Sequence, residues 1–260
     1  MIQVKNLQKR FDDKEVLKGI TADFNDGKCN LIIGQSGAGK TVLMSCIIGL
    51  FRPTSGEILY DGRDMVKMKL KQWKMLRREV GMLFQGSALF DSMTVLENAR
   101  FPLDMFSDMS EKERNERAQF CLERVNLGDA GHKYPGEISG GMQKRAAIAR
   151  AISLNPKYLF CDEPNSGLDP KTSLVIDELI YSITHEFNMT TIINTHDMNS
   201  VMGIGENIVF IDKGEKAWQG NSGEIMDSTN ERLNSFIFAS DLFKKIKAES
   251  QLEKMKGSHD

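Results

Sequence analysis

The sequence comprises 260 residues with a formal net charge of −2; 40% of its residues are hydrophobic and 27% are charged. This length favours one large domain or a core with a subdomain, and the near-neutral charge gives no sign of a nucleic-acid partner. The N-terminus carries charges where a signal peptide would be apolar, and the longest uncharged apolar run, residues 41–51, is too short to span a bilayer.

The N-terminal part of the chain is predicted to form strands that lead into a helix. Residues 2–33 show strand-like patterns, and their last segment, "CNLIIG", is continuously apolar, as in a strand that is covered on both faces. Residues 39–50 are predicted to be helical. The stretch "RPTSGEILYDG", residues 52–62, is typical of turn, strand and turn, because a proline and two glycines punctuate it.

The middle of the chain has a different character. Residues 86 to about 155 are polar-rich and predicted to be helical, and Ser110 with Glu113 indicates a capping box before one helix. Strand and helix patterns then alternate at residues 157–163, 171–187, 190–196, 197–203 and 207–212. This order predicts a nucleotide-binding α/β core interrupted by a helical insertion.

The segment "GQSGAGKT", residues 34–41, fits the pattern G-x-x-x-x-G-K-[ST] and lies between an apolar strand and a helix, the context of a P-loop. Its glycines would let backbone N–H groups close around phosphate oxygens, and the helix N-terminus adds partial positive charge. Lys40 is predicted to reach the β- and γ-phosphates, and the Thr41 hydroxyl to ligate Mg²⁺. The alternative is a glycine-rich turn without a ligand.

Two adjacent acids end the apolar segment "KYLFCDE", residues 157–163. If this strand is the neighbour of the strand before the P-loop, Asp162 lies beside the phosphates and is predicted to hold Mg²⁺ through water. Glu163 would point in a different direction and is predicted to orient or deprotonate the attacking water. The alternative is a strand that ends in two solvated carboxylates.

Two further polar residues follow apolar strands. His196, after "TTIIN", is predicted to sense the γ-phosphate, although a histidine in this position is more often a polar strand end. Gln85, in "GMLFQGSALF", is predicted to link the metal site to the helical insertion.

A second glycine stretch, "EISGGMQKRAAIAR" at residues 137–150, also opens a predicted helix. Ser139 suits the N-cap position, and Gly140 and Gly141 leave the first backbone N–H groups bare. Such a helix start can accept a phosphate. A nucleotide on the P-loop exposes one flank of its γ-phosphate, and a helix N-terminus from another molecule could cover that flank.

The segments "GQSGAGKT", "ISGGM", "LFCDEP", "SGLDP" and "NTHD", together with Gln85, occur in the order and spacing of an ABC transporter ATPase subunit, which residues 1–220 resemble. The resemblance implies an α/β P-loop NTPase core with a mixed central sheet, an N-terminal antiparallel β subdomain and an inserted α-helical subdomain. It also implies a head-to-tail homodimer with two ATP molecules. Each ATP would lie between Lys40 of one chain and the serine and glycines of the second stretch of the other.

The resemblance implies roles for individual residues as well. Asp169, in "SGLDP", corresponds to a loop residue that crosses the dimer interface, and Phe11 takes the place of an aromatic residue that stacks on adenine. The implied catalytic residues are Lys40, Gln85, Glu163 and His196. The implied Mg²⁺ ligands are Thr41, Gln85 and Asp162. The residues expected to bind ATP are Phe11, Val16, Gly34, Gln35, Ser36, Gly37, Ala38, Gly39, Lys40, Thr41, Val42, Ser139, Gly140, Gly141 and Asp169.

Residues 1–229 are accordingly assigned to an ABC ATPase domain, with the helical subdomain inserted at about residues 86–155. Residues 230–260 are assigned to a C-terminal helical extension, which is hypothesised to dock on the partner subunit or on a small regulatory subunit. Its apolar residues at helical spacing are Leu233, Phe236, Ile237, Leu242, Phe243 and Ile246.

One departure from the family pattern bears on the choice of transporter. Met142 follows the glycine pair where the family usually has glutamine, and a thioether cannot donate the hydrogen bonds of an amide. The segments "SGGMQKRAAIARA" and "ALFDSMTVLENARFPL" resemble the ATPases of Mla-type (maintenance of lipid asymmetry) systems. This resemblance implies two copies of the chain beneath two copies of a transmembrane permease, which moves phospholipid between inner and outer membranes.

Other readings stay open at this point. The chain could serve a sugar or amino-acid ABC transporter, or it could be a soluble ABC ATPase of DNA repair or translation. The soluble class usually carries long coiled-coil insertions or fused ATPase units, and this sequence has neither. A P-loop kinase or GTPase would leave "ISGGM" without a purpose.

The methionines and cysteines add two expectations. Seven methionines cluster around Gln85 and are hypothesised to line a groove for the permease's cytoplasmic coupling helix, with ordinary core packing as the alternative. They stand at positions 65, 68, 75, 82, 93, 105 and 109. The four cysteines form no CxxC pair and are predicted to be reduced thiols, so the protein is expected in the cytoplasm, peripheral to the inner membrane.

Overall fold

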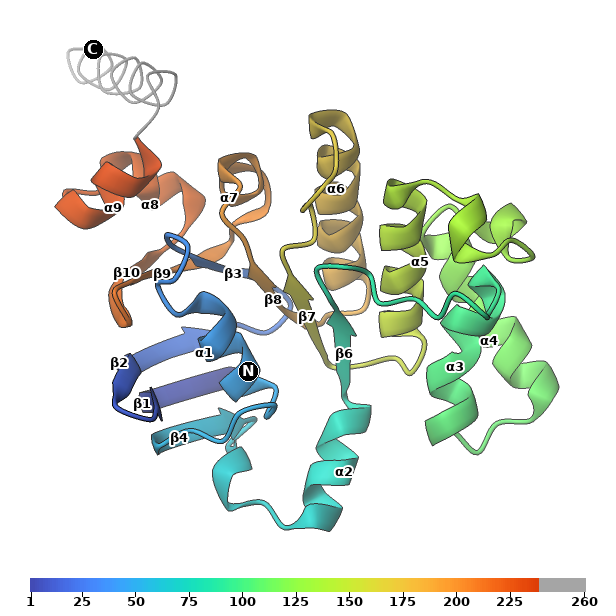
Figure 1. Cartoon of the computed structure of the whole chain (residues 1–260), viewed down its shortest axis with the longest axis horizontal. Helices are drawn as coiled ribbons and strands as arrows, with labels where there is room; N and C mark the ends of the chain where they lie inside the picture. Colours follow the sequence, from blue (N-terminus) through green and yellow to red (C-terminus); the bar gives the residue numbers. More distant parts are fainter. Residues whose placement is uncertain (239–260) are drawn as a thin grey trace, which may run out of the picture.

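The computed structural model describes residues 1–238, which form two β-sheets and a set of helices (Figure 1). The strands are β1 (Ile2–Phe11), β2 (Lys14–Phe24), β3 (Cys29–Ile33), β4 (Ser55–Tyr60), β5 (Arg63–Asp64), β6 (Val80–Leu83), β7 (Tyr158–Asp162), β8 (Thr190–Asn194), β9 (Asn207–Asp212) and β10 (Glu215–Gly220). The helices are α1 (Lys40–Ile47), α2 (Leu70–Arg78), α3 (Val95–Phe106), α4 (Glu111–Arg124), α5 (Gly140–Ile152), α6 (Pro170–Glu186), α7 (Met198–Ile204), α8 (Ser222–Asp227) and α9 (Glu231–Ile237).

The smaller sheet is antiparallel and has the strand order β2-β1-β4-β5. β1 and β2 form a hairpin whose tight turn places Asp12 at φ 49°, a left-handed conformation that aspartate tolerates. The predicted N-terminal antiparallel subdomain is therefore confirmed.

The larger sheet is mixed and has the strand order β10-β9-β3-β8-β7-β6. The five strands from β9 to β6 run parallel, and β10 is added antiparallel at one edge. β8 lies between β3 and β7, so the strand that ends in Asp162 is not the direct neighbour of the strand before the P-loop. The expectation that rested on neighbouring strands therefore needs correction, and β8 supplies the link between them, as the site geometry below shows.

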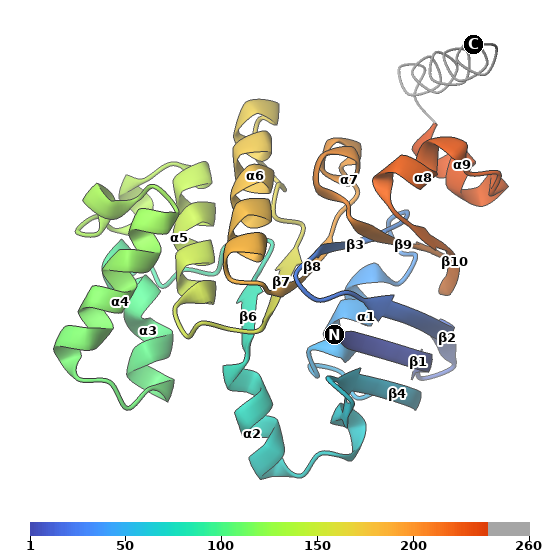
Figure 2. The same cartoon turned by 180° about the vertical axis from the view of Figure 1, so that it is seen from behind.

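Alternation along the central strands fills two separate cores. Leu31 and Ile33 of β3 point into a core that the helices α3–α7 cover, whereas Ile32 points into a core shared with α1 and the antiparallel sheet. This two-sided burial explains why β3 is a continuous apolar run, since successive side chains of a strand face opposite sides. Figures 1 and 2 show α1 with the smaller sheet on one side of the central sheet and α6 with α7 on the other.

The helical insertion consists of α3, α4 and α5, which pack against one another. The capping box predicted at the start of α4 is present, because Ser110 Oγ accepts from Glu113 N at 3.4 Å and Glu113 Oε2 accepts from Ser110 N at 2.7 Å. The sequence patterns do not indicate α2, α8 or β10, because each of these segments has only a few apolar residues among polar and charged ones. The predicted fold class agrees with the observed one.

The start of the C-terminal segment belongs to the main core. Leu233 and Ile237 of α9 are buried against the helical side of the central sheet, so these two side chains are not free to dock a partner. The other apolar residues of the hypothesised docking helix, Leu242, Phe243 and Ile246, lie outside the described residues. The division of the chain at residue 229 stays a prediction. Within residues 1–238, no helix is both long and apolar enough to cross a bilayer.

Candidate functional site

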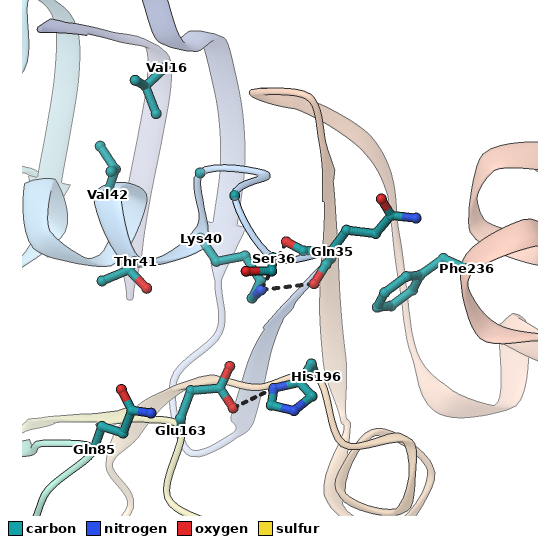
Figure 3. A pocket seen from close by; sticks show the side chains of 13 residues that line it. Val16, Gln35, Ser36, Lys40, Thr41, Val42, Gln85, Glu163, His196 and Phe236 are labelled. Carbon is teal, nitrogen blue, oxygen red and sulfur yellow. Dashed lines mark hydrogen bonds and ion pairs between the residues drawn. The ribbon is translucent and has the colours of Figure 1, made fainter. Parts of the chain in front are cut away.

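The loop between β3 and α1 forms one wall of a cavity of about 840 Å³ (Figure 3). Three glycines of this loop have positive φ: Gly34 at 150°, Gly37 at 78° and Gly39 at 109°. A Cβ at Gly34 would lie 2.2 Å from the carbonyl oxygen of Ile211, so this turn can be built only without a side chain. The resulting backbone has the form of a phosphate cradle at a helix N-terminus.

Lys40 begins α1 and folds back over the loop. Its ammonium donates hydrogen bonds to the carbonyl oxygens of Gly34 at 2.8 Å and Gln35 at 3.2 Å, and only 8% of the residue is exposed. Burial lowers the pKa of Lys40, while the carboxylates of Glu163 and Asp162 act in the opposite direction. The lysine is therefore held inside the loop, where a phosphate could replace the carbonyl contacts.

Asn194 at the end of β8 connects two of the three predicted metal ligands, Thr41 and Asp162. Its side-chain NH₂ group donates to the Asp162 carboxylate at 2.7 Å and to the Thr41 hydroxyl at 3.2 Å. The amide oxygen of Asn194 is buried and has no hydrogen-bond partner. The strand between β3 and β7 thus brings Thr41 and Asp162 together, although their own strands are not neighbours.

These residues fit a Mg²⁺ ion that is shared with a phosphate. Thr41 and Asp162 offer a hydroxyl and a carboxylate oxygen, and Mg²⁺ in such sites takes one or two protein oxygens together with water and phosphate. No cluster of three or more His, Cys, Asp or Glu side chains occurs in residues 1–238, so the chain has no all-protein metal cage in that range. Thr41, Asp162 and the predicted third ligand, Gln85, would hold the ion only with help from a nucleotide.

Glu163 and His196 lie together on the side of the cavity opposite the P-loop (Figure 3). His196 Nδ1 lies 2.8 Å from Glu163 Oε2, and the histidine side chain is 70% exposed. Glu163 has φ 47°, a conformation that is uncommon outside glycine, and its N–H donates to the carbonyl oxygen of Asn194 at 2.8 Å. This turn directs the Glu163 carboxylate away from that of Asp162 and into the cavity.

Gln85 follows β6 and also reaches the cavity. Its side-chain NH₂ group donates to Ser166 Oγ at 3.2 Å. Its backbone carbonyl oxygen accepts a hydrogen bond from the ammonium of Lys144 in α5. Arg150 of the same helix donates to the carbonyl oxygens of Ser87 and Ala88. The Gln85 loop is therefore tied to α5 at several points, which provides a physical link between the cavity and the helical insertion.

Twelve of the residues predicted for the site line this cavity: Val16, Gly34, Gln35, Ser36, Gly37, Gly39, Lys40, Thr41, Val42, Gln85, Glu163 and His196. Phe236 of α9 lines it as well and stacks on Phe210 with ring centroids 5.3 Å apart. Ala38 is buried inside the loop. Phe11 is not among the lining residues; it packs edge-on against Phe51, and Lys9 Nζ lies 4.7 Å from its ring centre. Its stacking on adenine stays a prediction.

The second glycine stretch lies apart from this cavity. Ser139 Oγ accepts from Met142 N at 3.3 Å and so caps α5, as predicted, and both Ser139 and Gly140 are exposed. Figures 1 and 2 show α6 between α5 and α1. Neither the serine nor the two glycines of this stretch line the cavity of the same chain.

Asp169 lies close to the second stretch and caps α6. Its carboxylate accepts from Thr172 N at 3.0 Å, and the hydrogen bonds with Thr172 lower the pKa of Asp169. A Cβ at Gly141 would lie 2.6 Å from Thr172 Cγ2, so Gly141 is needed for the contact between α5 and α6. The predicted role of Asp169 in a dimer stays a prediction.

Met142 and Gln143 are both turned toward their own chain. Met142 packs against the helical core, and Gln143 Nε2 donates to the carbonyl oxygen of Pro135 at 2.9 Å. Gln143 therefore does not take over the position of the glutamine that the methionine replaces.

The family model described as ABC transporter matches residues 17–166, which is more than half of the chain. The chain belongs to the ABC transporter family. The prediction of an ATP-binding subunit of an ABC transporter is thus confirmed, and the predicted enzyme class, an ATPase, is that of the family's cassettes.

Two curated relatives show how far the likeness of this ABC protein extends. It is 40% identical over 207 residues to a probable ribonucleotide transport ATP-binding protein, mkl, of Mycobacterium leprae, and the match covers 80% of this chain and 60% of that protein. It is 37% identical over 237 residues to methionine import ATP-binding protein MetN 1 of Oceanobacillus iheyensis, with 90% and 70% covered. The chain thus spans about three fifths of the length of the mycobacterial relative.

Solved structures support the same family and fold. The chain superposes on cbiO1 of Clostridium perfringens, part of the transporter complex cbiONQ, with a TM-score of 0.82 and 28% identity over 96% of this chain and 98% of that one. It superposes on a dimeric post-hydrolysis state of the cassette MJ0796 bound to ADP and Pi with a TM-score of 0.76 and 32% identity, covering 85% and 99%.

The sequence patterns do not indicate several residues that build the site: Asn194, Phe236, Ser166, Lys144 and Arg150. Asn194 ends an apolar strand, which is a usable signal, but its partners depend on the strand order. Lys144 lies on a helix face with small apolar neighbours, and only the packing reveals its 4% exposure and the consequent lowering of its pKa by burial.

Proposed function

We propose that this ABC protein hydrolyses ATP in a Mg²⁺-dependent reaction as a head-to-tail homodimer, and that the reaction drives a membrane permease. The observation that carries the proposal is the separation of the two phosphate-binding surfaces. The P-loop, Glu163 and His196 converge on one cavity, whereas Ser139 and Gly140 are exposed elsewhere on the same chain. A second copy can bring the missing surface to each nucleotide.

The residues of the cavity would act on the terminal phosphate as follows. Lys40 and the P-loop N–H groups would bind the phosphate oxygens, and the metal ion, when bound, would neutralise part of their charge. Glu163 would take a proton from the attacking water. His196, at 2.8 Å from the Glu163 carboxylate, would fix the orientation of that carboxylate and contact the γ-phosphate.

The decisive experiment replaces Glu163 by Gln. The change keeps the shape of the side chain and removes the base, so ATP turnover should fall by about 10²–10⁴-fold while ATP binding is retained. Sedimentation with ATP should then show an accumulated dimer. A Glu163→Gln protein that turns over ATP at the wild-type rate would contradict the assignment. Lys40→Ala should instead weaken nucleotide binding itself.

An apolar groove supports the expectation of a permease partner. It has a volume of about 520 Å³ and is lined by aromatic side chains and two arginines, among them Phe84, Phe90, Phe101, Phe106 and Arg150. Of the seven clustered methionines, Met82 alone lines this groove, to which phenylalanine contributes four side chains. Met65, Met68 and Met75 line two neighbouring hollows, and the hypothesis of a methionine-lined groove stays a prediction. Exposed aromatic rings in a groove suit an inserted helix.

The groove is connected to the nucleotide cavity through the Gln85 loop. Phe84 lines the groove and Gln85 lines the cavity, and Arg150 holds the carbonyl oxygens of Ser87 and Ala88. We infer that a coupling helix of the permease inserts here and shifts with the nucleotide state. Crosslinks from Phe90 should reach the permease in assembled complexes, and their absence would contradict the inference.

We propose phospholipid as the transported substrate, because "SGGMQKRAAIARA" and "ALFDSMTVLENARFPL" resemble the Mla-type ATPases. The assembly would contain two ATPase chains, two permeases and possible small regulators, on the cytoplasmic face of the inner membrane. The second candidate is import of a small solute, since the relatives named above are described as ribonucleotide and methionine transport proteins. Phospholipid that copurifies with the intact complex would favour the first candidate, and its absence the second.

A further inference from the structure

Helix α2 and the residues before it form a compact cationic surface. Residues 67–78 hold six basic residues and no acidic one, although the whole chain has a net charge of −2: Lys67, Lys69, Lys71, Lys74, Arg77 and Arg78. Lys67 pairs with Glu57 and Asp64. Among the ion pairs of residues 1–238, none involves the other five, and Arg77 lies over the ring of Trp73 with its Cζ 5.3 Å from the ring centre. Within that range, no carboxylate pairs with these five cations.

The orientation of α2 follows from its buried side. Leu76 is 1% exposed, and Trp73 packs against Gly49, whose Cβ would lie 1.9 Å from the indole. At 100° per residue, the opposite face carries Lys71, Lys74 and Arg78. All three are exposed. Burial of Leu76 and packing of the partly buried Trp73 thus fix these cations toward the outside.

Two large apolar side chains accompany the cations. Leu70 is 73% exposed and Met75 is 61% exposed, the largest values among the exposed hydrophobic residues of the described chain apart from Leu50 at 63%. Exposed apolar side chains of this size do not increase the solubility of a helix. A short helix with exposed apolar side chains among lysines and arginines is typical of binding at a membrane–water interface.

The position of α2 places this surface beside the aromatic groove. Arg77 at its C-terminal end and Val80 just after it line the groove. Figures 1 and 2 show α2 and α3 reaching toward the same edge of the molecule. The end of α3 and the following loop add exposed apolar side chains at Met105, Phe106 and Met109.

We propose that α2 binds anionic phospholipid headgroups at the surface of the membrane that carries the permease. The orientation of this edge toward a membrane depends on the proposed function, in which the permease binds in the aromatic groove. The affinity for lipid depends on α2 itself. Lys71, Lys74 and Arg78 contact the headgroups, each strengthening binding roughly fivefold. Leu70 and Met75 insert into the interface.

The test uses the full-length chain and vesicles, without permease or nucleotide. Wild-type protein should co-sediment with vesicles of phosphatidylcholine that contain roughly one third phosphatidylglycerol, and much less with phosphatidylcholine alone. The variant Lys71→Glu/Lys74→Glu/Arg78→Glu should bind the anionic vesicles at least tenfold more weakly. Lys71→Arg/Lys74→Arg keeps the charge and should bind like wild type. Leu70→Ser/Met75→Ser should show a smaller decrease.

A matched control makes the same change of charge elsewhere. Lys5→Glu/Lys18→Glu/Lys112→Glu alters exposed lysines on β1, β2 and α4 and should leave vesicle binding unchanged. Equal binding by wild type and the α2 triple variant would overturn the proposal, as would an equal loss in the control. Binding of a short RNA by α2 in place of vesicles would overturn it too. The α2 variants should retain ATPase activity, so loss of vesicle binding is separable from failure of the proposed ATPase.

Discussion

The two glycine stretches of this chain, at residues 34–41 and 137–150, resemble each other in sequence but differ in how far the fold requires glycine in them. Gly34, Gly37 and Gly39 all have positive φ, and a Cβ at Gly34 would meet Ile211 O at 2.2 Å. Gly140 adopts ordinary helical backbone, and the nearest atom to a Cβ there would be Leu168 Cδ2 at 3.8 Å. The first stretch needs glycine in order to fold. At position 140, the fold of the chain itself does not require glycine.

This difference indicates where each surface does its work. The P-loop glycines allow the chain to form the loop that surrounds its own Lys40. Gly140, exposed and uncrowded, leaves bare N–H groups at the start of α5 without any benefit to the protomer, since alanine would favour the helix by about 1 kcal/mol. The absence of a side chain there suits an external ligand, in agreement with the proposed dimer. The four predictions that follow test this contrast, beginning with the largest effect.

The largest effect is expected from Gly140→Glu. A carboxylate at the start of α5 would face the phosphates of the nucleotide held by the other copy, and like charges at an interface cost several kcal/mol, so ATPase activity should fall by at least about 100-fold. Thermal unfolding should be nearly unchanged, because the position has room. Gly136→Glu, four residues earlier and also in open space, is the control and should stay active. Retained activity in Gly140→Glu would argue against the dimer site.

The next effect concerns the stability of the P-loop. Gly34→Ala should lower the free energy of unfolding by about 2–4 kcal/mol, because the methyl group collides with the Ile211 carbonyl and the backbone is strained. Gly37→Ala, at φ 78° with nothing within 4 Å, should lose only about 1–2 kcal/mol. Denaturant unfolding of both variants measures the difference. Equal stabilities would mean that the collision is not the reason for glycine at Gly34.

A smaller effect is expected from Asn194→Ala, which removes the amide between Thr41 and Asp162. The shorter of its two hydrogen bonds, to the Asp162 carboxylate, is worth about 1–1.5 kcal/mol, so the Mg²⁺ concentration for half-maximal ATPase activity should rise by about 5- to 10-fold. The maximal rate should change less, because Asn194 acts by positioning the ligands. Asn199→Ala, an exposed change on α7, is the control. An unchanged Mg²⁺ requirement would remove this role from Asn194.

The smallest effect concerns the cap of α6 beside the second stretch. The pKa of Asp169 is lowered by its hydrogen bonds with Thr172, so the charged cap stabilises the fold above the ordinary aspartate pKa of about 4, and this contribution is lost as the pH falls through the lowered value. Asp169→Asn should therefore be slightly less stable than wild type at pH 7 and equal to it at strongly acidic pH. A stability difference that persists in acid would show that charge is not responsible.

Much of the fold could be predicted from the sequence. The continuous apolar runs of β3, β7 and β8 and the capping residue Ser110 are local signals, and each produced the expected element. Helix α2 was not predicted, because lysines lie on its outward face and only Trp73 and Leu76 mark its inward face. Its significance as a surface appears only when the exposure of Leu70 and Met75 is known.

The site divides in the same way. The spacing of "GQSGAGKT" was sufficient to predict that Lys40 and Thr41 would lie at one phosphate loop, because a P-loop has a fixed local geometry. That Glu163 lines the same cavity depended on the order of the strands. The placement of β8 between β3 and β7, with Asn194 bridging Thr41 and Asp162, depended on the pairing of β8 with β3, a strand near the other end of the chain. The approach of Phe236 to the cavity depended on how α9 packs on the core.

The sequence by itself indicated the proposed chemistry: a phosphate loop, a proposed base, proposed metal ligands and a second, bare helix start. All of them are short segments whose conformation is set by neighbouring residues. Tertiary structure alone decided which strand lies between the proposed metal ligands, that four phenylalanines line the groove, and that the cations of α2 face outward. These features depend on burial between distant segments, and the free energy of that burial belongs to the assembled core rather than to any stretch of the chain.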